Sequence, residues 1–331
     1  MQCGNRNNNS SPRPSLVDPE HSLDVPIVQE ENICLPLVIS AVSKYWGVDL
    51  PMTEAREIAS RYPGVKGTIL IEGVELAERH GLGSVILNSS LKELQRFIDM
   101  GIPPIVILPG IQDVVQHASL VIGYDDVEKT IFHYIPEPDK IGAIPNNTFD
   151  RQWHEDERLV LLLAPADIMA EAKIAGNSRT RSNRICFDAE KQRLQGRTEE
   201  AITLLKEALV LYPSNSTAAC LYAGILNDLN KQEAVQYYKK SIELNPRCYL
   251  AYRGLGNFYL KTKDYPNAEK YYTFALEVNP YRFVPIYKNR AIARMEQGKT
   301  AQAREDLEKY LDQMPDAQDK TAILQAIKEL G

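Results

Sequence analysis

Two different patterns of apolar and polar positions divide the chain near its middle. In the first half, apolar positions at helical spacing come first, and short runs rich in β-branched residues follow. The helical spacing predicts helices over residues 36–46, 53–60, 73–80 and 91–100. The short runs, bounded by Gly, Pro and Asp, predict strands at residues 104–108, 118–122, 130–134 and 159–163. Helices followed by strands indicate an α+β domain with an antiparallel sheet rather than a parallel βαβ array.

The second half of the chain repeats itself. Prolines recur at intervals of 33, 34 and 35 residues, at Pro213, Pro246, Pro280 and Pro315. Twelve residues before each proline lies an alanine, at Ala201, Ala234, Ala268 and Ala303. A bulky residue follows each alanine by four positions, at Leu205, Tyr238, Tyr272 and Leu307, and three positions further lie Ala208, Ser241, Ala275 and Tyr310. This coincidence predicts four copies of a helical hairpin.

Each of these repeat positions has a packing role. The small residue lets the two helices of a hairpin approach closely, the bulky residue fills space on the same face, and the proline ends the second helix. Because every hairpin leaves an apolar face uncovered, the copies must stack and the last one must be capped. Residues 316–330, with Ile323, Leu324 and Ile327 on one side, fit a capping helix.

The repeats resemble the tetratricopeptide consensus. The third repeat has all its signature positions, namely Tyr252, Leu255, Gly256, Tyr259, Ala268, Tyr272, Ala275 and Pro280. The fourth departs from it, with Asn289 and Arg290 where Leu-Gly is usual and an extra residue before Gly298. The resemblance implies an all-α solenoid that holds a protein or peptide, and surplus tyrosines suit an extended peptide on a concave face. The alternative is a scaffold or dimerisation element.

Composition narrows the possible partners. The 331 residues are enough for two domains, each with its own core. A formal net charge of -6, with Lys and Arg spread along the chain, makes nucleic acid an unsuitable ligand. The longest apolar runs fall well short of the roughly 20 residues of a membrane-spanning helix. We therefore expect polypeptide partners and no transmembrane segment.

The cysteines and histidines predict neither a metal site nor a disulfide framework, and no cofactor is expected. Three of the five cysteines, Cys186, Cys220 and Cys248, lie in helical patterns and are expected to be core residues. Cys3, followed by Gly4 and a polar stretch, has the pattern that a processed bacterial lipoprotein begins with. If so, Cys3 carries lipid and the protein lies in the cell envelope, lipid-anchored or periplasmic; otherwise Cys3 is an exposed thiol and a cytoplasmic location is expected.

Three residues of the first half are candidates for catalysis. Cys34 precedes Leu35-Pro36 and an apolar helix, which places it at the helix N-terminus. The partial positive charge there would lower the pKa of the Cys34 thiol and favour the nucleophilic thiolate. His117 begins an expected strand, from which its imidazole can reach a thiolate across a cleft. The Gln29 side chain could complete an oxyanion hole with the Cys34 backbone N–H.

The order of these residues resembles the papain-like fold, and specifically the bacteriocin-processing (double-glycine) peptidase family. The likeness covers most of residues 25–164 and includes Val25-Pro26, Tyr45-Trp46-Gly47, Gly67-Thr68 and Pro103-Pro104-Ile105-Val106-Ile107. It implies Cys34 as nucleophile, His117 as general base and then acid, and Gln29 as oxyanion donor. A papain-like domain followed by tetratricopeptide repeats also resembles a group of bacterial peptidase-like envelope proteins.

Two departures from that family concern its chemistry. Leu35 stands where the family has glycine after the cysteine, which puts a side chain where substrate needs backbone access. The carboxylate or amide that should orient the imidazole falls near His133-Tyr134, where the sequence has neither. Glu137, before Pro138, is the nearest substitute.

These observations predict five segments. They are a tether over residues 1–22, a papain-like α+β domain over 23–166, a linker over 167–183, four tetratricopeptide repeats over 184–315 and a capping helix over 316–331. The first hypothesis is a cysteine peptidase whose repeats recruit the polypeptide substrate. The second is an inactive peptidase-like domain that acts with the repeats as a protein-binding adaptor in an envelope assembly. Leu35 and the missing carboxylate favour the second hypothesis, and the retained Gln29, Cys34 and His117 favour the first.

Overall fold

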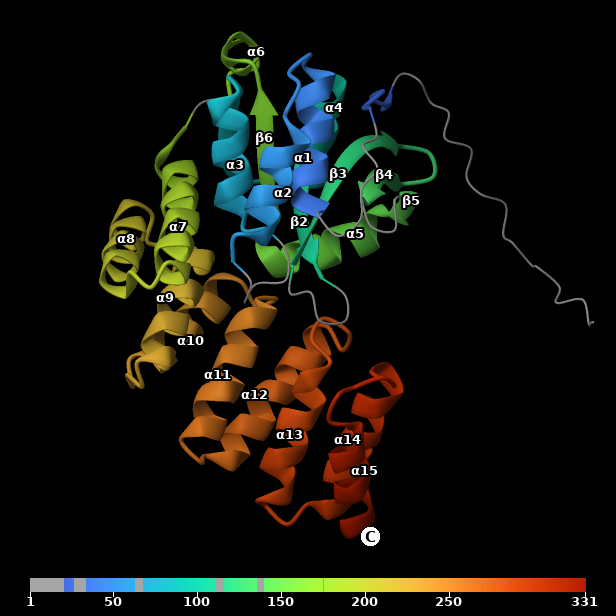
Figure 1. Cartoon of the computed structure of the whole chain (residues 1–331), viewed down its shortest axis with the longest axis vertical. Coiled ribbons are helices and arrows are strands. Elements are labelled where there is room, and N and C mark those ends of the chain that lie inside the picture. Colours follow the sequence, from blue (N-terminus) through green and yellow to red (C-terminus); the bar gives the residue numbers. More distant parts are fainter. Residues whose placement is uncertain (1–20, 27–33, 63–67, 111–115, 136–139, 175) are drawn as a thin grey trace, which may run out of the picture.

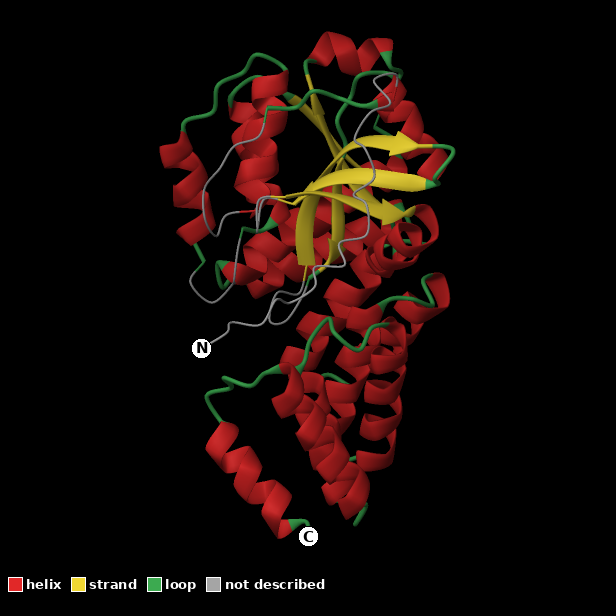
Figure 2. Cartoon of the chain, turned by 90° about the vertical axis from the view of Figure 1, so that its right-hand side faces the viewer, coloured by secondary structure: helices red, strands yellow, loops and turns green. Residues whose placement is uncertain are grey.

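A computed structural model describes residues 21–26, 34–62, 68–110, 116–135, 140–174 and 176–331. Its N-terminal part contains a six-stranded sheet in the order β1-β6-β2-β3-β4-β5, seen in Figure 2 between helices. All neighbouring strands are antiparallel. The strands are β1 (Gly83–Asn88), β2 (Ile105–Pro109), β3 (Gln116–Asp125), β4 (Thr130–Ile135), β5 (Lys140–Pro145) and β6 (Leu159–Ala164).

Helices cover both faces of the sheet (Figure 1). On one face lie α1 (Cys34–Tyr45), α2 (Met52–Ser60) and α3 (Leu70–Arg79). On the other lie α4 (Leu91–Asp99), α5 (Asn146–Trp153) and α6 (Ala166–Glu171), and a short 3-10 helix, η2 (His154–Asp156), follows α5. The alternation of the strands separates the two cores, since Ile105 and Ile107 of β2 pack toward α1 while Val106 and Leu108 pack toward α5.

The C-terminal part is a row of helices that runs away from the sheet toward the chain end (Figure 1). Successive antiparallel pairs pack together, and a last helix packs on the fourth pair. The pairs are α7 (Ser178–Leu194) with α8 (Thr198–Leu211), α9 (Ser216–Asp228) with α10 (Ala234–Leu244), α11 (Tyr249–Lys261) with α12 (Tyr265–Val278), and α13 (Pro285–Met295) with α14 (Thr300–Gln313), followed by α15 (Lys320–Glu329).

The repeat positions behave as their packing roles require. The four alanines at the start of the pattern are fully buried, and the four bulky residues after them are at most 4 % exposed. Helices α8, α10, α12 and α14 each end two residues before one of the four prolines. Cys186, Cys220 and Cys248 are buried thiols, as expected. The predicted fold class, an α+β domain with an antiparallel sheet followed by an all-α solenoid, is confirmed.

The segment 167–183, expected as a linker, is mostly helical. It contains most of α6 and the first turn of α7, which begins with a reciprocal capping box between Asn177 and Thr180. Helix α7 covers the edge strand β1, where Asn183 donates to the Ile86 carbonyl oxygen (3.2 Å). Its Lys191 also pairs with Glu75 of α3 (2.6 Å). The polar composition that predicted a linker therefore serves an interface with the sheet domain.

Two strands and two helices were not predicted from the sequence. Strand β5 alternates exposed with partly buried residues, and β1 contains only one fully buried residue, Ile86, so neither gives a strong apolar run. Helices α5 and α6 follow Pro145 and Pro165 and span only eight and six residues. Among the described helices, none is long and apolar enough to cross a membrane.

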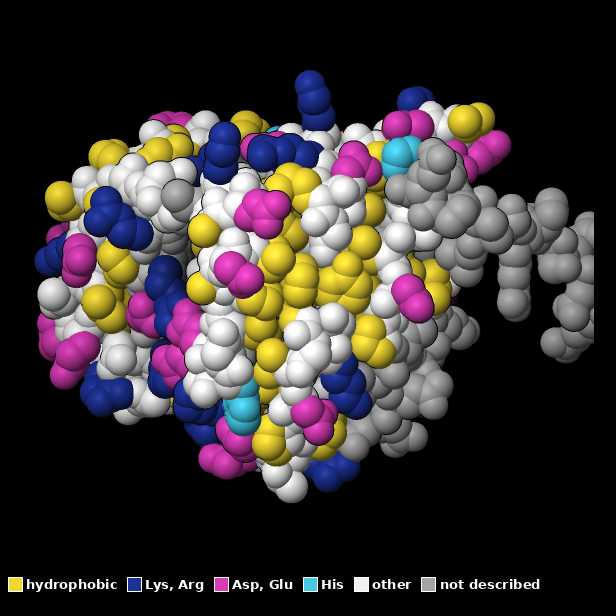
Figure 3. Space-filling view, turned by 90° about the horizontal axis from the view of Figure 1, so that it is seen from above, with side chains coloured by type: hydrophobic (Ala, Val, Ile, Leu, Met, Phe, Trp, Pro, Cys, Tyr) yellow, Lys and Arg dark blue, Asp and Glu magenta, His cyan; other side chains and the backbone are white. Residues whose placement is uncertain are grey.

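Figure 3 shows the end of the molecule away from the repeats. Apolar side chains form a band across the described part of this face, bordered by Lys and Arg side chains that stand among Asp and Glu. The mixture of signs agrees with the dispersed charges of the sequence. On this face the described side chains therefore offer no continuous basic surface to a polyanion.

The hairpin packing makes Gly254 a sensitive position. A Cβ atom at Gly254 of α11 would lie 2.3 Å from ring carbons of Tyr238, the bulky residue of the second repeat. We expect Gly254→Ala to lower the free energy of unfolding by about 1–3 kcal/mol, because the ring must leave its packed position. Gly224→Ala in α9 is the matched control, since its nearest atom is the Tyr238 hydroxyl at 3.9 Å. It should be neutral or stabilising by up to about 1 kcal/mol. Urea unfolding followed by circular dichroism compares the two; equal effects would refute this packing role.

Candidate functional site

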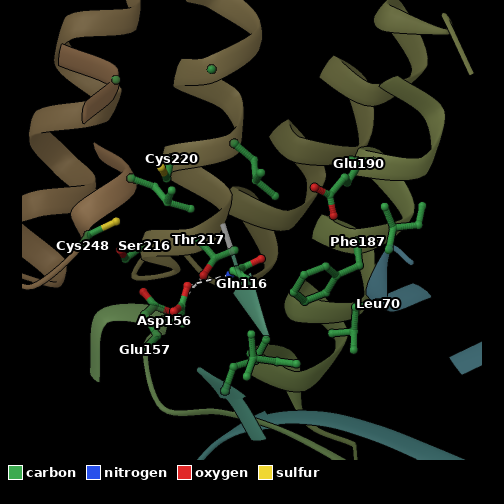
Figure 4. Close-up of a pocket in the computed structure, with 18 of the residues that line it drawn as sticks. Leu70, Gln116, Asp156, Glu157, Phe187, Glu190, Ser216, Thr217, Cys220 and Cys248 are labelled. Carbon is green, nitrogen blue, oxygen red and sulfur yellow. Dashed lines mark hydrogen bonds between the residues drawn. The ribbon is translucent and has the colours of Figure 1, made fainter. Parts of the chain in front are cut away.

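A cavity of about 690 Å³ lies where the sheet domain meets the repeats. The sheet domain contributes the starts of α1, α3 and β3, together with η2 and the turn after it. The repeats contribute α7, α9 and α11. Figure 4 shows Asp156 and Glu157 rising from the sheet side toward Ser216 and Thr217 of α9, with Phe187 and Glu190 of α7 at the other end. The volume is in the range of ordinary ligand sites.

The structure describes only part of the predicted catalytic set. Cys3, Gln29 and Glu137 lie outside the described residues. Cys34 is the first residue of α1, as its position before Pro36 predicted, but its side chain is not among those described. Leu35, the next residue, lines the cavity together with His117. The start of α1 and the start of β3 therefore open into one space.

His117 is a partly buried histidine whose imidazole is largely shielded from solvent. Burial lowers the pKa of its imidazole to about 4. Its Nε2 atom has no hydrogen-bond partner among the described residues. Strand alternation places His117 on the same sheet face as Ser119, and that face carries α5, whereas α1 packs on the opposite face with Ala118. The fold therefore places His117 at the cavity. The pairing of His117 with Cys34 stays a prediction.

His133 occupies the place where the family resemblance led us to look for an orienting carboxylate. It is buried, its Nδ1 donates to the Ser119 hydroxyl (2.8 Å), and Ser119 donates in turn to the Tyr134 carbonyl oxygen (2.9 Å). Burial, and then the neighbouring His117, lower the pKa of His133 to about 4. A neutral imidazole here cannot supply the negative charge that would stabilise an imidazolium at His117.

Asp156 forms an acidic wall of the cavity. One oxygen, Oδ1, accepts hydrogen bonds from Gln116 (2.6 Å) and from Arg282 (2.8 Å). The other oxygen, Oδ2, is buried and has no partner among the described residues. Asp156 as a whole is 8 % exposed. Because Oδ2 is fully buried, a ligand in the cavity can reach it only if neighbouring side chains move.

The turn that carries the acidic wall is held in an uncommon conformation. Glu157 and Arg158 both have positive φ angles, 56° and 53°, in the left-handed region that residues other than glycine seldom adopt. Arg158 makes a two-pronged contact with Asp150 (2.6 and 2.8 Å), and Asn88 donates to the Glu157 carbonyl oxygen (2.9 Å). These bonds offset the strain and fix the Glu157 side chain beside Thr217.

Three carboxyl groups of this region resist ionisation. Burial raises the pKa of Glu155, Glu157 and Glu190, although nearby arginines oppose the shift in each case. At the repeat end of the cavity, a hydrogen bond with Cys248 is the main cause that raises the pKa of the Cys220 thiol. The same bond lowers the pKa of Cys248. The cavity therefore combines acidic groups, thiols and a neutral imidazole.

Most of the polar residues that line this cavity were not predicted from the sequence. Gln116, Asp156, Glu157 and Glu190 belong to no recognised motif, and only the fold brings them together. One feature of the sequence does mark the interface between the repeats and the sheet domain. Asn245 and Asn279 directly precede two of the repeat prolines, and their side chains donate to the His154 carbonyl oxygen (3.0 Å) and to Glu155 (3.3 Å).

Comparisons with known proteins bear mainly on the repeats. Residues 230–281 and 289–317 match tetratricopeptide repeat families. A comparison with curated proteins finds no match.

Several solved structures are similar to part of the chain, all at low TM-scores. Pseudomonas aeruginosa PilF is 22% identical over 46% of this chain and 69% of its own, with a TM-score of 0.41. A MamA protein is 22% identical over 47% of this chain and 82% of its own, with a TM-score of 0.41. The peptidase domain of Streptococcus ComA, a bifunctional ABC transporter, is 22% identical over 44% of this chain and 98% of its own, with a TM-score of 0.35. The C-terminal region of this chain carries tetratricopeptide repeats.

Proposed function

We propose that the protein binds a segment of a polypeptide in the junction cavity, between its peptidase-like domain and its repeats. The observation that carries the proposal is the composition of the cavity wall, which both parts of the chain build together. Tetratricopeptide repeats are protein-interaction modules, and here α9 and α11 face the start of β3 across the cavity. A partner held by the repeats is thereby presented to His117 and to the start of α1.

Whether the bound segment is also cleaved separates two candidate functions. For hydrolysis, the Cys34 thiolate attacks the peptide carbonyl, His117 delivers the proton to the leaving amine, and water then releases the acyl group from sulfur with His117 as base. The shared cavity of Leu35 and His117 favours this candidate. The adaptor candidate is favoured by the neutral His117, which does not hold a thiolate by charge, and by His133 in the orienting position.

Filling the cavity with a large side chain tests whether the polypeptide binds there. We expect Thr217→Trp, which inserts a ring beside Glu157, to abolish binding of a reduced and alkylated, unfolded test polypeptide. Thr203→Trp is the matched control, because Thr203 is exposed on α8 and does not line the cavity. Fluorescence anisotropy of the labelled polypeptide measures both variants. Equal binding by the two variants would place the partner elsewhere.

Cleavage is tested through the reactivity of Cys34. A working peptidase needs a thiolate at neutral pH, so alkylation of Cys34 by iodoacetamide should follow a pKa well below the free-thiol value of about 8.5. Mass spectrometry of the Cys34 peptide gives the rate at each pH, and Cys34→Ser identifies the signal. If the Cys34 pKa is about 8.5 and the test polypeptide is bound but not cleaved, the result contradicts the peptidase function and supports the adaptor function.

A further inference from the structure

We propose that Cys220 and Cys248 form a redox-active thiol pair in the wall of the junction cavity, which hydrogen peroxide converts to a disulfide. This site goes beyond the proposed function, because its chemistry needs no bound polypeptide. Figure 4 shows both side chains on the repeat side of the cavity. Cys220 lies on α9, and Cys248 directly precedes α11.

The two thiols are in contact with each other. Cys220 donates a hydrogen bond to Cys248, and this bond is the first cause both of the raised pKa of Cys220 and of the lowered pKa of Cys248. Both residues belong to one buried cluster of the second and third hairpins, and both are free thiols. Thiols that already share a hydrogen bond need only a short approach to reach the disulfide bond length of about 2.05 Å.

The surroundings of Cys248 favour its thiolate. The Ser241 hydroxyl donates to the Cys248 sulfur (3.4 Å). The backbone N–H of Ala251, in the first turn of α11, also lowers the pKa of Cys248, in keeping with the partial positive charge of a helix N-terminus. Burial and, more weakly, Glu157 oppose this shift. Since the net direction is downward, Cys248 is the nucleophilic member of the pair.

Arg253 adds a cation beside Cys220. Its side chain lines the cavity and lies over the Phe283 ring, 4.7 Å from the centroid. Among the described residues no carboxylate forms an ion pair with Arg253, whereas its charge lowers the pKa of Cys220 against the larger effects of Cys248 and burial. Reactive cysteines occur in such electropositive surroundings. The cation is placed to stabilise Cys220 when that thiol gives up its proton.

The cavity gives a small oxidant access to this pair. Cys220 and Cys248 are 9 % and 7 % exposed and line a space of about 690 Å³, which admits a molecule as small as peroxide. Cys186, the third buried thiol of the repeats, differs in each respect. It is fully buried, does not line the cavity, and burial raises the pKa of its thiol.

The chemistry takes two steps. The Cys248 thiolate attacks one peroxide oxygen, the O–O bond breaks, and the hydroxide that leaves takes up a proton to become water, so that Cys248 is a sulfenic acid. The Cys220 sulfur then loses its proton and attacks the sulfenic sulfur, which releases the second water and forms the disulfide. Two thiols are oxidised and one peroxide is reduced to two waters. A dithiol reductant restores the pair by thiol–disulfide exchange.

The test oxidises the folded, full-length chain with hydrogen peroxide. Remaining thiols are blocked with N-ethylmaleimide in denaturant, and trypsin digestion with mass spectrometry locates the new bond. We expect a linked pair of peptides, residues 207–231 with 248–253, that dithiothreitol separates. Cys186 is the internal control in the same chain, and it should oxidise about tenfold more slowly or less, because it lacks both the thiolate and the cavity.

Two variants separate the roles of the thiols, with circular dichroism to check that each folds. Cys248→Ser should slow the oxidation of Cys220 about tenfold or more, since the reactive thiolate is gone. Cys220→Ser should stop Cys248 at the sulfenic acid, which dimedone captures. Oxidation of Cys220 and Cys248 no faster than that of Cys186, or a linked peptide that forms only in urea, overturns the inference. Either result leaves the proposed polypeptide binding standing, because the test contains no polypeptide.

Discussion

Replacing Arg282 with methionine should destabilise the chain by about 3–5 kcal/mol, which is typical when a buried ion pair loses one partner. Arg282 precedes α13 and is fully buried. Its guanidinium bonds Glu155 (3.1 Å) and Asp156 (2.8 Å) of the sheet domain and lies over the Tyr249 ring. Methionine fills a similar volume but leaves two buried carboxylates without this cation. The repeats should then separate from the sheet domain at lower urea concentration.

Two spectroscopic signals can follow this separation independently. Both tryptophans, Trp46 and Trp153, belong to the sheet domain, and Trp153 directly precedes η2. Their fluorescence reports that domain, whereas circular dichroism is dominated by the repeat helices. In the parent chain we expect the two urea transitions to coincide, and in Arg282→Met we expect them to split, because the interface no longer couples the two parts.

Controls distinguish charge loss from general damage. Arg304→Met removes a surface arginine whose partner, Glu308, lies one helical turn away, and should cost less than about 1 kcal/mol. Adding Glu155→Gln and Asp156→Asn to Arg282→Met should recover part of the lost stability, since the uncompensated carboxylates are then removed. A loss below about 1 kcal/mol for Arg282→Met alone would mean that this contact does not hold the two parts together.

The repeats could be predicted in detail because their signal is local and recurs. Each alanine, bulky residue and proline packs within its own hairpin or the next, so that the spacing along the chain reflects spacing in the fold. Gly254 and Gly256, beside Tyr238 and Tyr272, show how strictly these positions are filled. Expected helices such as 91–100 and strands such as 130–134 also lie within two residues of α4 and β4.

The cavity could not be predicted, because its parts are far apart in the sequence. Gln116 at the start of β3, Asp156 at the end of η2 and Glu190 on α7 come together only when the repeats fold back on the sheet. Nothing in the local pattern marks Arg282 as buried, since an arginine after a repeat proline is ordinarily exposed. The roles expected for Gln29, Cys34 and Glu137 remain predictions, because those side chains lie outside the described residues.

The second large effect concerns pH and the neighbouring histidines His117 and His133. Each has a pKa lowered to about 4 by burial, compared with about 6.5 in an unfolded chain. Between these values the unfolded chain binds more protons than the folded one, so stability is complete above about pH 6.5 and is lost as pH falls toward 4. The loss is about 3 kcal/mol for each histidine at the low end of this window.

A single substitution isolates one of the two contributions. His133→Asn keeps an N–H donor for the Ser119 hydroxyl but cannot take up a proton. At pH 7.5 the variant should be less stable than the parent, because packing against Phe149 is reduced. At pH 4.5 its stability relative to the parent should improve by about 2–3 kcal/mol, since it has no imidazole to protonate on unfolding.

Urea midpoints at the two pH values measure this difference between the variant and the parent. Comparing the two proteins cancels the opposing titration of Glu155, Glu157 and Glu190, which both proteins share. Stability curves that run parallel from pH 7.5 to 4.5 would show that His133 keeps an ordinary pKa in the fold.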